Sequence, residues 1–367
     1  MTDPKSNKQP IYNFGAGPAC LPVDVLEQIR DDIPDWYEGM SIMEISHRLP
    51  VFMELTQSIE QDLRSLLTIP DEFAVLFMHG GARTQFSAVP LNLLNGSKVA
   101  DYLVTGHWSD LAYQDAQRYC QPHLVASSKE EHYTKIPEEK EWNFSKQGAY
   151  LHYTDNETIH GVEFPHPPKV KDKWLISDMT SNILTKPIDF SSYGLIYASA
   201  QKNLGIAGIT VVIVRKELLG KEHPFTPPTM SYAFCEKTQS MGNTSPVFCW
   251  YVLGLVLKWV KKQGNCETLA NACKQKSTLI YDVIDNSNNF YISPVVKEYR
   301  SRVNVPFRLP SAELETLFLN EANAIGLKQL KGHKTVGGCR ASLYNAMPLE
   351  GVEKLAEFMK EFEKTRG

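Results

Sequence analysis

A lysine at the end of a predicted buried strand has the most reactive chemistry in this chain. Lys202 follows the apolar run 194–199 and lies among small residues, with Ala200 before it and Gly205 after it. Burial there disfavours the ammonium ion and lowers its pKa, which frees the amine to attack an aldehyde. Small neighbours let a flat ring approach closely. Taken alone, the segment also fits an ordinary surface lysine in a β-turn.

Two further segments place complementary groups after predicted strands. Asp178 ends the apolar run 174–177, where a carboxylate either caps a helix or pairs with the nitrogen of a pyridinium ring. Gly80 and Gly81 follow another apolar run, and glycines that open a helix present N–H groups to a phosphate. A plain turn is the alternative there, and the spacing matches no nucleotide-binding motif. Together the three segments supply the lysine, acid and phosphate cradle of a pyridoxal 5′-phosphate (PLP) site.

The elements that must position these groups alternate between strands and helices through the first two-thirds of the chain. Alternation of this kind predicts an α/β fold with a mostly parallel sheet covered on both faces. Ligands gather at the carboxyl ends of such strands, so the three segments should meet at one edge. The expected strands are 73–78, 99–104, 149–153, 174–177, 194–199 and 209–214, with helices at 51–67 and 108–119 and a loop at 127–146.

After about residue 265 the pattern changes to few strands and exposed helices. This predicts a smaller α+β domain, and a chain of 367 residues is long enough for two domains. We therefore expect a large domain with an N-terminal arm over 1–264 and a small domain over 265–367. The expected elements of the small domain are helices at 267–284 and 312–324, strands at 302–307 and 340–344, and a helix from Leu349.

Composition excludes several classes of partner. The net charge of −4 argues against a nucleic-acid binder dominated by phosphate contacts. The seven cysteines are scattered and form no Cys-x-x-Cys pair, so we expect reduced thiols, no disulfide framework and no metal site. Residues 1–10 lack the apolar core of a signal peptide, and the apolar run 247–257 is too short to cross a bilayer and favours a buried helix. These features predict a cytoplasmic protein that neither spans nor binds a membrane.

Several phrases along the chain point to one family. They are NFGAGP at 13–18, EISHR at 44–48, QFSAVPLN at 85–92, NETIHG at 156–161, AQKN at 200–203, NT at 243–244 and GGCRASLYN at 337–345. From Ile11 to the C-terminus, the chain resembles the phosphoserine aminotransferases, a class V family of PLP-dependent enzymes. The resemblance implies PLP-dependent transferase fold type I, the aspartate-aminotransferase-like fold.

The resemblance also implies roles for residues around the cofactor. Lys202 would carry PLP as a Schiff base and shuttle a proton, and Asp178 would hold the ring nitrogen. Trp108 would stack on the ring, although a core tryptophan is the alternative, and Thr158 would bond the ring's 3-hydroxyl. The cofactor phosphate would be held near Ala82, Arg83 and Gln201, and by Asn243 and Thr244 of the partner subunit in a homodimer with shared active sites.

For the substrate, the resemblance implies that Arg340 binds the α-carboxylate through a bidentate fork. His47 and Arg48 would surround the substrate phosphate together with His333 and Lys334 of the other chain. The implied reaction moves an amino group from glutamate to 3-phosphohydroxypyruvate and yields O-phospho-L-serine and 2-oxoglutarate. A second implied substrate is 4-phosphohydroxy-L-threonine of pyridoxine synthesis.

Departures and rival functions accompany this interpretation. Ala82 stands where the family commonly has glycine, Ala16 where some members have serine, and Lys334 where arginine is frequent. These departures bear on substrate affinity and not on the reaction. One rival is another enzyme of this fold, such as an alanine–glyoxylate aminotransferase or a cysteine desulfurase, whose nucleophile could only be Cys339 beside Arg340. The other rival is a non-catalytic protein that binds phosphorylated metabolites.

Overall fold

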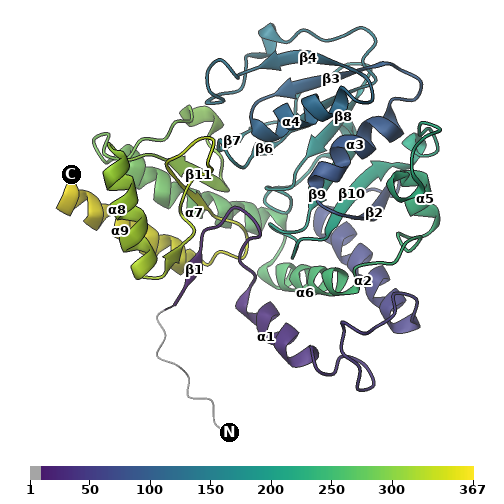
Figure 1. Ribbon diagram of the computed structural model, residues 1–367, viewed down its shortest axis with the longest axis horizontal. Helices are drawn as coiled ribbons and strands as arrows, with labels where there is room; N and C mark the ends of the chain where they lie inside the picture. The colour runs from purple at the N-terminus through teal and green to yellow at the C-terminus, as the bar shows by residue number, and fades with distance from the viewer. Residues whose placement is uncertain (1–9) are drawn as a thin grey trace.

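A seven-stranded sheet forms the centre of the large part of the molecule (Figure 1). The computed structural model describes residues 10–367. The strand order is β2-β10-β9-β8-β5-β3-β4, and all neighbours are parallel except β10, which runs antiparallel to both β2 and β9. The strands are β2 (Phe73–His79), β3 (Val99–Val104), β4 (Gln121–Ser127), β5 (Tyr150–Thr154), β8 (Trp174–Asp178), β9 (Tyr193–Ser199) and β10 (Ile209–Arg215). The expected mostly parallel sheet is therefore confirmed.

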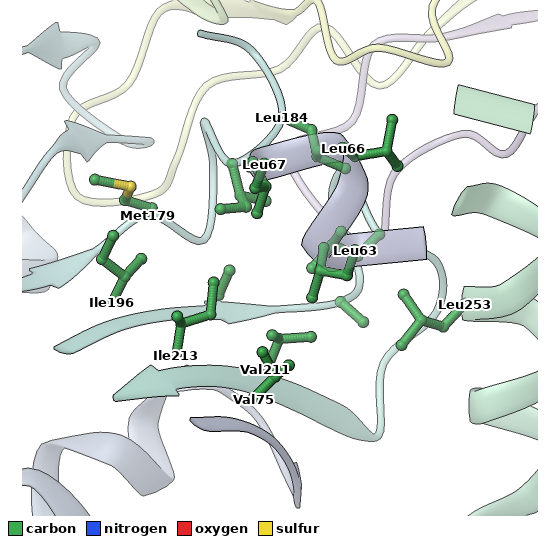
Figure 2. Close-up of a cluster of buried hydrophobic side chains, with 14 of the residues drawn as sticks. Leu63, Leu66, Leu67, Val75, Met179, Leu184, Ile196, Val211, Ile213 and Leu253 are labelled. Carbon is green, nitrogen blue, oxygen red and sulfur yellow. The ribbon is translucent and has the colours of Figure 1, made fainter. Parts of the chain in front are cut away.

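Helices cover both faces of this sheet because successive strand residues, all apolar, point to opposite sides. On one face, Val75 and Val211 pack against Leu63 of α2, with Leu253 of α6 in the same cluster (Figure 2). On the other face, the neighbouring residues Leu76 and Val212 share a cluster with side chains of α3 and α4. The covering helices are α2 (Pro50–Leu67), α3 (Ala82–Leu93), α4 (His107–Ala116), α5 (Tyr232–Lys237) and α6 (Val247–Gln263).

The C-terminal elements build a second core beside the sheet (Figure 1). They are α7 (Cys266–Asp285), β11 (Asn304–Phe307), α8 (Ala312–Ala324), β12 (Leu327–Lys328), β13 (Cys339–Ser342) and α9 (Leu349–Arg366). The N-terminal strand β1 (Tyr12–Asn13) pairs with β12, so Tyr12 and Phe14 pack in this second core. The division into 1–264 and 265–367 stays a prediction, although the start of the described chain packs with the C-terminal elements.

Most predicted elements are confirmed within a few residues of their ends. The helix expected over 108–119 begins one residue earlier and ends at Ala116. The apolar run 247–257 is the beginning of α6, and no helix within residues 10–367 is both long and apolar enough to span a membrane. Sequence patterns missed α1 (Val23–Asp32), β4, β1, β12 and the short hairpin β6 (Asn156–Glu157) and β7 (Val162–Glu163).

A buried ion pair joins the two parts of the chain. Arg302, just before β11, donates to both carboxylate oxygens of Glu163 in β7, at 2.6 Å from Nη2 and 3.2 Å from Nε. Burial alone would raise the Glu163 pKa, but Arg302 and Lys186 outweigh burial and hold that pKa below its usual value. The charged pair therefore helps to fix the C-terminal part against the sheet.

Replacing Arg302 by methionine should lower the free energy of unfolding by about 2–3 kcal/mol, because a buried carboxylate loses its partner. The expected loss in the free energy of unfolding is small for a buried ion pair, because 27% of the Arg302 side chain remains exposed. Urea unfolding measures this change. Arg366→Met, which removes an exposed pair with Glu321, is the control and should cost less than about 1 kcal/mol. Equal losses in the two variants would contradict the assignment.

Candidate active site

The carboxyl ends of the parallel strands bring the predicted groups to one edge of the sheet. Asp178 is the last residue of β8, and Lys202 follows the end of β9 by three positions. Thr158 comes directly after the short strand β6, which continues from β5. Gly81 precedes α3 at the end of β2. Segments from four strands thus converge, as the parallel-sheet rule requires.

Lys202 is buried, and its amine lies in the centre of this edge. The side chain is 9% exposed, and Nζ donates to Thr158 Oγ1 at 2.5 Å. The Lys202 pKa falls to about 8, mainly because of burial and also because of the Arg340 charge, while the charges of Asp178 and Glu157 oppose the shift. A substantial fraction of the amine is therefore neutral near pH 8, which is the form that attacks a carbonyl carbon.

Asp178 is a buried carboxylate without an ion pair among residues 10–367. Its Oδ1 accepts the N–H of Thr180 at 2.8 Å. Burial raises the Asp178 pKa, although this hydrogen bond and the Lys202 charge lower it. A cationic ring nitrogen beside the carboxylate would supply the missing opposite charge. The acid therefore fits a protonated pyridine ring.

The loop after β2 has the geometry of a phosphate cradle. Gly80 has a φ of +94°, and a Cβ there would lie 2.7 Å from Thr84 Oγ1, so only glycine fits. Ala82 and Arg83 open α3 and present the backbone N–H groups of its first turn. The Arg83 side chain turns away and donates to Asp115 at 3.2 Å. Arg83 therefore offers its backbone N–H, and not its guanidinium, to the expected phosphate.

Gln201 and the N-terminal loop close another side of the site. The Gln201 side chain accepts a hydrogen bond from the Ser199 hydroxyl. A Cβ on Gly17 would lie 3.5 Å from Lys202 Cγ, so the loop around Gly17 packs directly on the lysine stem. The neighbouring Ala16 carbonyl accepts a hydrogen bond from Tyr344 at 2.7 Å. The departure at Ala16 therefore lies next to the site.

Among the buried donors without a partner in residues 10–367, two belong to residues expected at the ring and at the α-carboxylate. These atoms are the indole Nε1 of Trp108 and Nε of Arg340. Trp108 lies in the first turn of α4, and Arg340 lies in β13 of the C-terminal part. Because an unpaired buried donor is costly, both atoms mark places where a bound molecule would accept hydrogen bonds. The Trp108 indole suits an aromatic ring, and the Arg340 guanidinium suits a carboxylate.

The histidines form two separate groups within the chain. The His333 ring lies 5.8 Å from the ring of His107. Burial is the main cause that lowers the His333 pKa, and the charges of His107 and then Arg340 lower it further. His47 lies instead near His79, whose pKa it lowers in addition to burial. The expectation that His333 comes from the other chain therefore stays a prediction, although His333 and Arg340 also lie close together within one chain.

The remaining predicted residues lie at the surface. Arg48, Lys334 and Thr244 are exposed in the single chain. Asn243 is also exposed, and its Nδ2 lies 2.9 Å from Nδ1 of His79 at the end of β2. Their exposure leaves these side chains accessible to a second subunit.

Sequence reasoning missed several residues at this edge. His107, His160 and Tyr133 line a cavity of about 620 Å³ beside the site. The ring of Tyr133 packs on His160 at 4.7 Å between centroids. A signal was present, because His107 precedes Trp108 and His160 follows Thr158 by two positions. No group of three or more potential metal ligands occurs between residues 10 and 367.

With this geometry established, the chain can be compared with known proteins. The family model described as aminotransferase class-V matches residues 11–355. The chain belongs to the class-V aminotransferases.

Several similar proteins carry the name phosphoserine aminotransferase. The chain is 48% identical to the phosphoserine aminotransferase of Coxiella burnetii (strain CbuG_Q212), over 97% of this chain and 99% of the relative. It is 43% identical to the solved phosphoserine aminotransferase of Bacillus circulans subsp. alkalophilus, with a TM-score of 0.94, over 97% of this chain and 99% of that one. The PLP-bound phosphoserine aminotransferase of Trichomonas vaginalis matches with a TM-score of 0.92 and 39% identity, over 95% and 99%. The expected family and fold type are confirmed.

The pKa of Lys202 should respond in opposite directions to two substitutions. Asp178→Asn removes a charge that raises this pKa, so it should fall below its value of about 8, whereas Arg340→Met should raise it. The pH dependence of Lys202 acylation in PLP-free protein, followed by peptide mass spectrometry, measures both shifts. Shifts of the same sign in both variants would show that altered burial, and not charge, sets the reactivity.

Proposed function

We propose that this class-V aminotransferase transfers the amino group of glutamate to 3-phosphohydroxypyruvate, with O-phospho-L-serine and 2-oxoglutarate as products. The observation that carries the proposal is the buried Lys202 amine, 2.5 Å from Thr158 Oγ1 and electrostatically coupled to Asp178. The reaction is the one named for relatives that match nearly the full length of the chain. It belongs to serine biosynthesis.

The residues at the sheet edge fit PLP as the cofactor. When bound, PLP supplies an aldehyde that links covalently to an amine and a ring that accepts the electron pair released at Cα. Lys202 would hold the aldehyde carbon and, as a free amine, would move a proton to or from the substrate Cα. Asp178 would keep the ring nitrogen protonated. Trp108 would pack on the ring, and Thr158 would bind its 3-hydroxyl.

The cofactor phosphate binds at the cradle that opens α3. The donors that we assign on this chain are the backbone N–H groups of Ala82 and Arg83, which open α3, and the side-chain amide of Gln201, whose oxygen already accepts from Ser199. Asn243 and Thr244 reach the phosphate of the partner subunit's cofactor in a homodimer. Their exposure in the single chain supports this assignment. The methyl group of Ala82 adds bulk beside the cradle without removing a donor.

Arg340 binds the substrate α-carboxylate, and its unpaired buried Nε supports this role. His333 and Lys334 bind the substrate phosphate from the same chain as Arg340, and His47 and Arg48 approach it from the partner subunit. The initial expectation took His333 and Lys334 from the other chain, and a single chain does not test it. The contact of His333 with His107 beside the site, while His47 lies near His79, supports the assignment proposed now.

Charge around the site favours an anionic substrate. The cavity beside the active site is lined by Lys129 and Arg308, and no Asp or Glu is among its described lining residues. Charge-assisted hydrogen bonds contribute about 1.5–3 kcal/mol each. Two or three of them at a phosphate favour phosphoserine over serine by about 10³-fold or more.

The rival desulfurase reaction needs an accessible thiolate. Cys339 is 1% exposed, and burial raises the pKa of its thiol far above the ordinary value. A thiol of this kind is inert as a nucleophile. The structure of the site thus favours amino transfer over desulfuration.

Three finer statements belong to the proposal. We propose that the protein acts in the cytoplasm, that it is a homodimer with shared active sites, and that it also acts on 4-phosphohydroxy-L-threonine in pyridoxine biosynthesis. The scattered free cysteines are compatible with a reducing compartment. The phosphate-binding residues suit both phosphorylated substrates.

Borohydride reduction of the PLP-loaded protein should attach the cofactor to Lys202 alone. The reduced peptide is identified by mass spectrometry, and Lys202→Ala should yield no adduct at that peptide and no measurable transamination. Lys276, which is also buried but bonds the Tyr344 and Met347 carbonyls, serves as an internal comparison. An adduct on Lys276 or on a surface lysine in place of Lys202 would refute the proposed site.

Arg340→Met should lower kcat/KM for phosphoserine with 2-oxoglutarate by about 10²-fold or more, because two charge-assisted hydrogen bonds of about 1.5–3 kcal/mol each are lost. Steady-state kinetics measure the effect. Arg308→Met, at the cavity rim, is the matched control and should change kcat/KM by less than about tenfold. A comparable loss in both variants would show that Arg340 does not bind the carboxylate specifically.

A further inference from the structure

We propose that Glu157 is a positioning residue for the cofactor, because its carboxylate holds the first turn of α4 and with it Trp108. The inference rests on the proposed function, since Trp108 is the residue expected on the ring face. Glu157 ends β6 and directly precedes Thr158. Neither the chemistry at Lys202 nor the substrate contacts require it.

Three hydrogen bonds carry the inference. Glu157 Oε2 accepts the Trp108 N–H at 3.0 Å, and Oε1 accepts the N–H of Ser109 at 2.8 Å and its hydroxyl at 2.6 Å. The Glu157 residue is fully buried. Helix N-termini leave N–H groups that a neighbouring side chain usually caps, but the residue before α4 is Gly106. A carboxylate 48 residues away in the sequence takes this role.

Gly106 and Glu157 fit each other sterically. A Cβ on Gly106 would lie 2.2 Å from Glu157 Cδ, which no side chain can tolerate without displacing the carboxylate. The φ of Gly106 is 179°, an extended conformation open to any residue. Glycine is therefore needed here for space alone. Glycine at position 106 has no side chain to cap α4, and the space it leaves holds the Glu157 carboxylate, which caps the helix instead.

The same short segment holds both sides of the cofactor site. Glu157 fixes Trp108 through its backbone, while the next residue, Thr158, accepts a hydrogen bond from Lys202 Nζ at 2.5 Å. A negative charge is also favoured at a helix N-terminus. Loss of the Glu157 charge would free the first turn of α4, so the indole would lose its fixed orientation relative to the lysine.

The strength with which Glu157 fixes the first turn of α4 should depend on pH. Burial raises the pKa of Glu157 to about 7, although its bonds to Ser109 and Trp108 lower it. Above this pH, both oxygens accept, whereas protonation replaces one acceptor by an O–H group that faces an N–H donor. The ionisable groups that interact with the carboxylate are Lys202, Asp178 and Tyr133. His107 stands in the first turn of α4, where its N–H donates to His160 Nδ1.

The test compares PLP binding by wild type and Glu157→Gln, with the visible circular dichroism of bound PLP as the readout. At a pH of about 8, one unit above the Glu157 pKa of about 7, the variant should bind PLP about tenfold more weakly or worse and show a reduced dichroic band. At a pH of about 6, the wild-type carboxyl is itself neutral, so the ratio of dissociation constants should approach one.

Asp101→Asn is the matched control, because Asp101 is another fully buried carboxylate, on β3 of the seven-stranded sheet. It pairs with Lys173 and accepts the Ser145 N–H, near the opposite end of β3. This variant should lose thermal stability but keep the wild-type PLP affinity at both pH values. A purely structural role for Glu157 would make the two variants behave alike.

Equal PLP affinity of wild type and Glu157→Gln at both pH values would overturn the inference, as would a loss of the same size at both. If Glu157→Gln does not fold, Ser109→Ala removes one donor and leaves the carboxylate. It should bind PLP more weakly at a pH of about 8, and unchanged binding would equally overturn the inference. Failure of the wild type to bind PLP would instead refute the proposed function.

Discussion

The site depends on holding one amine and one carboxylate out of water at the edge of a parallel sheet. Removing ionised groups from water costs several kcal/mol each, so a chain tolerates the arrangement only where the surrounding fold fixes it. Lys202 meets this cost by a lowered pKa, and Asp178 by the Thr180 hydrogen bond and a raised pKa. A bound ring that carries a positive nitrogen and accepts an amine relieves both groups at once.

The fold supplies this constraint through elements from both halves of the chain. The amine and the carboxylate follow neighbouring parallel strands, whose apolar residues are covered by helices on both faces. Arg340 comes from β13 in the C-terminal part, and the ion pair of Arg302 with Glu163 holds that part to the large sheet. The strand that carries Arg340, the proposed carboxylate-binding residue, is thus held near the edge with Lys202 by an ion pair that has no proposed chemical role.

Sequence patterns predicted the lysine, the acid and the glycine loop because each follows a short apolar run, and parallel strands bring such ends together. The partnership of Glu157 with Gly106, and of His333 with His107, could not be predicted in the same way. These contacts join residues far apart in the sequence without any periodic signal. The pairing of β1 with β12 was not predicted either, because strands of two residues are too short to show an alternation of apolar and polar residues.

A crystal structure of the protein with PLP and phosphoserine would test the pairing of Lys202 with Asp178 at the cofactor. We expect a ring covered by Trp108, with its nitrogen within hydrogen-bond distance of the Asp178 carboxylate and its C4′ next to Lys202 Nζ. The substrate carboxylate should lie on Arg340. A ring whose nitrogen faces solvent, or a cofactor bound away from Lys202, would contradict this assignment.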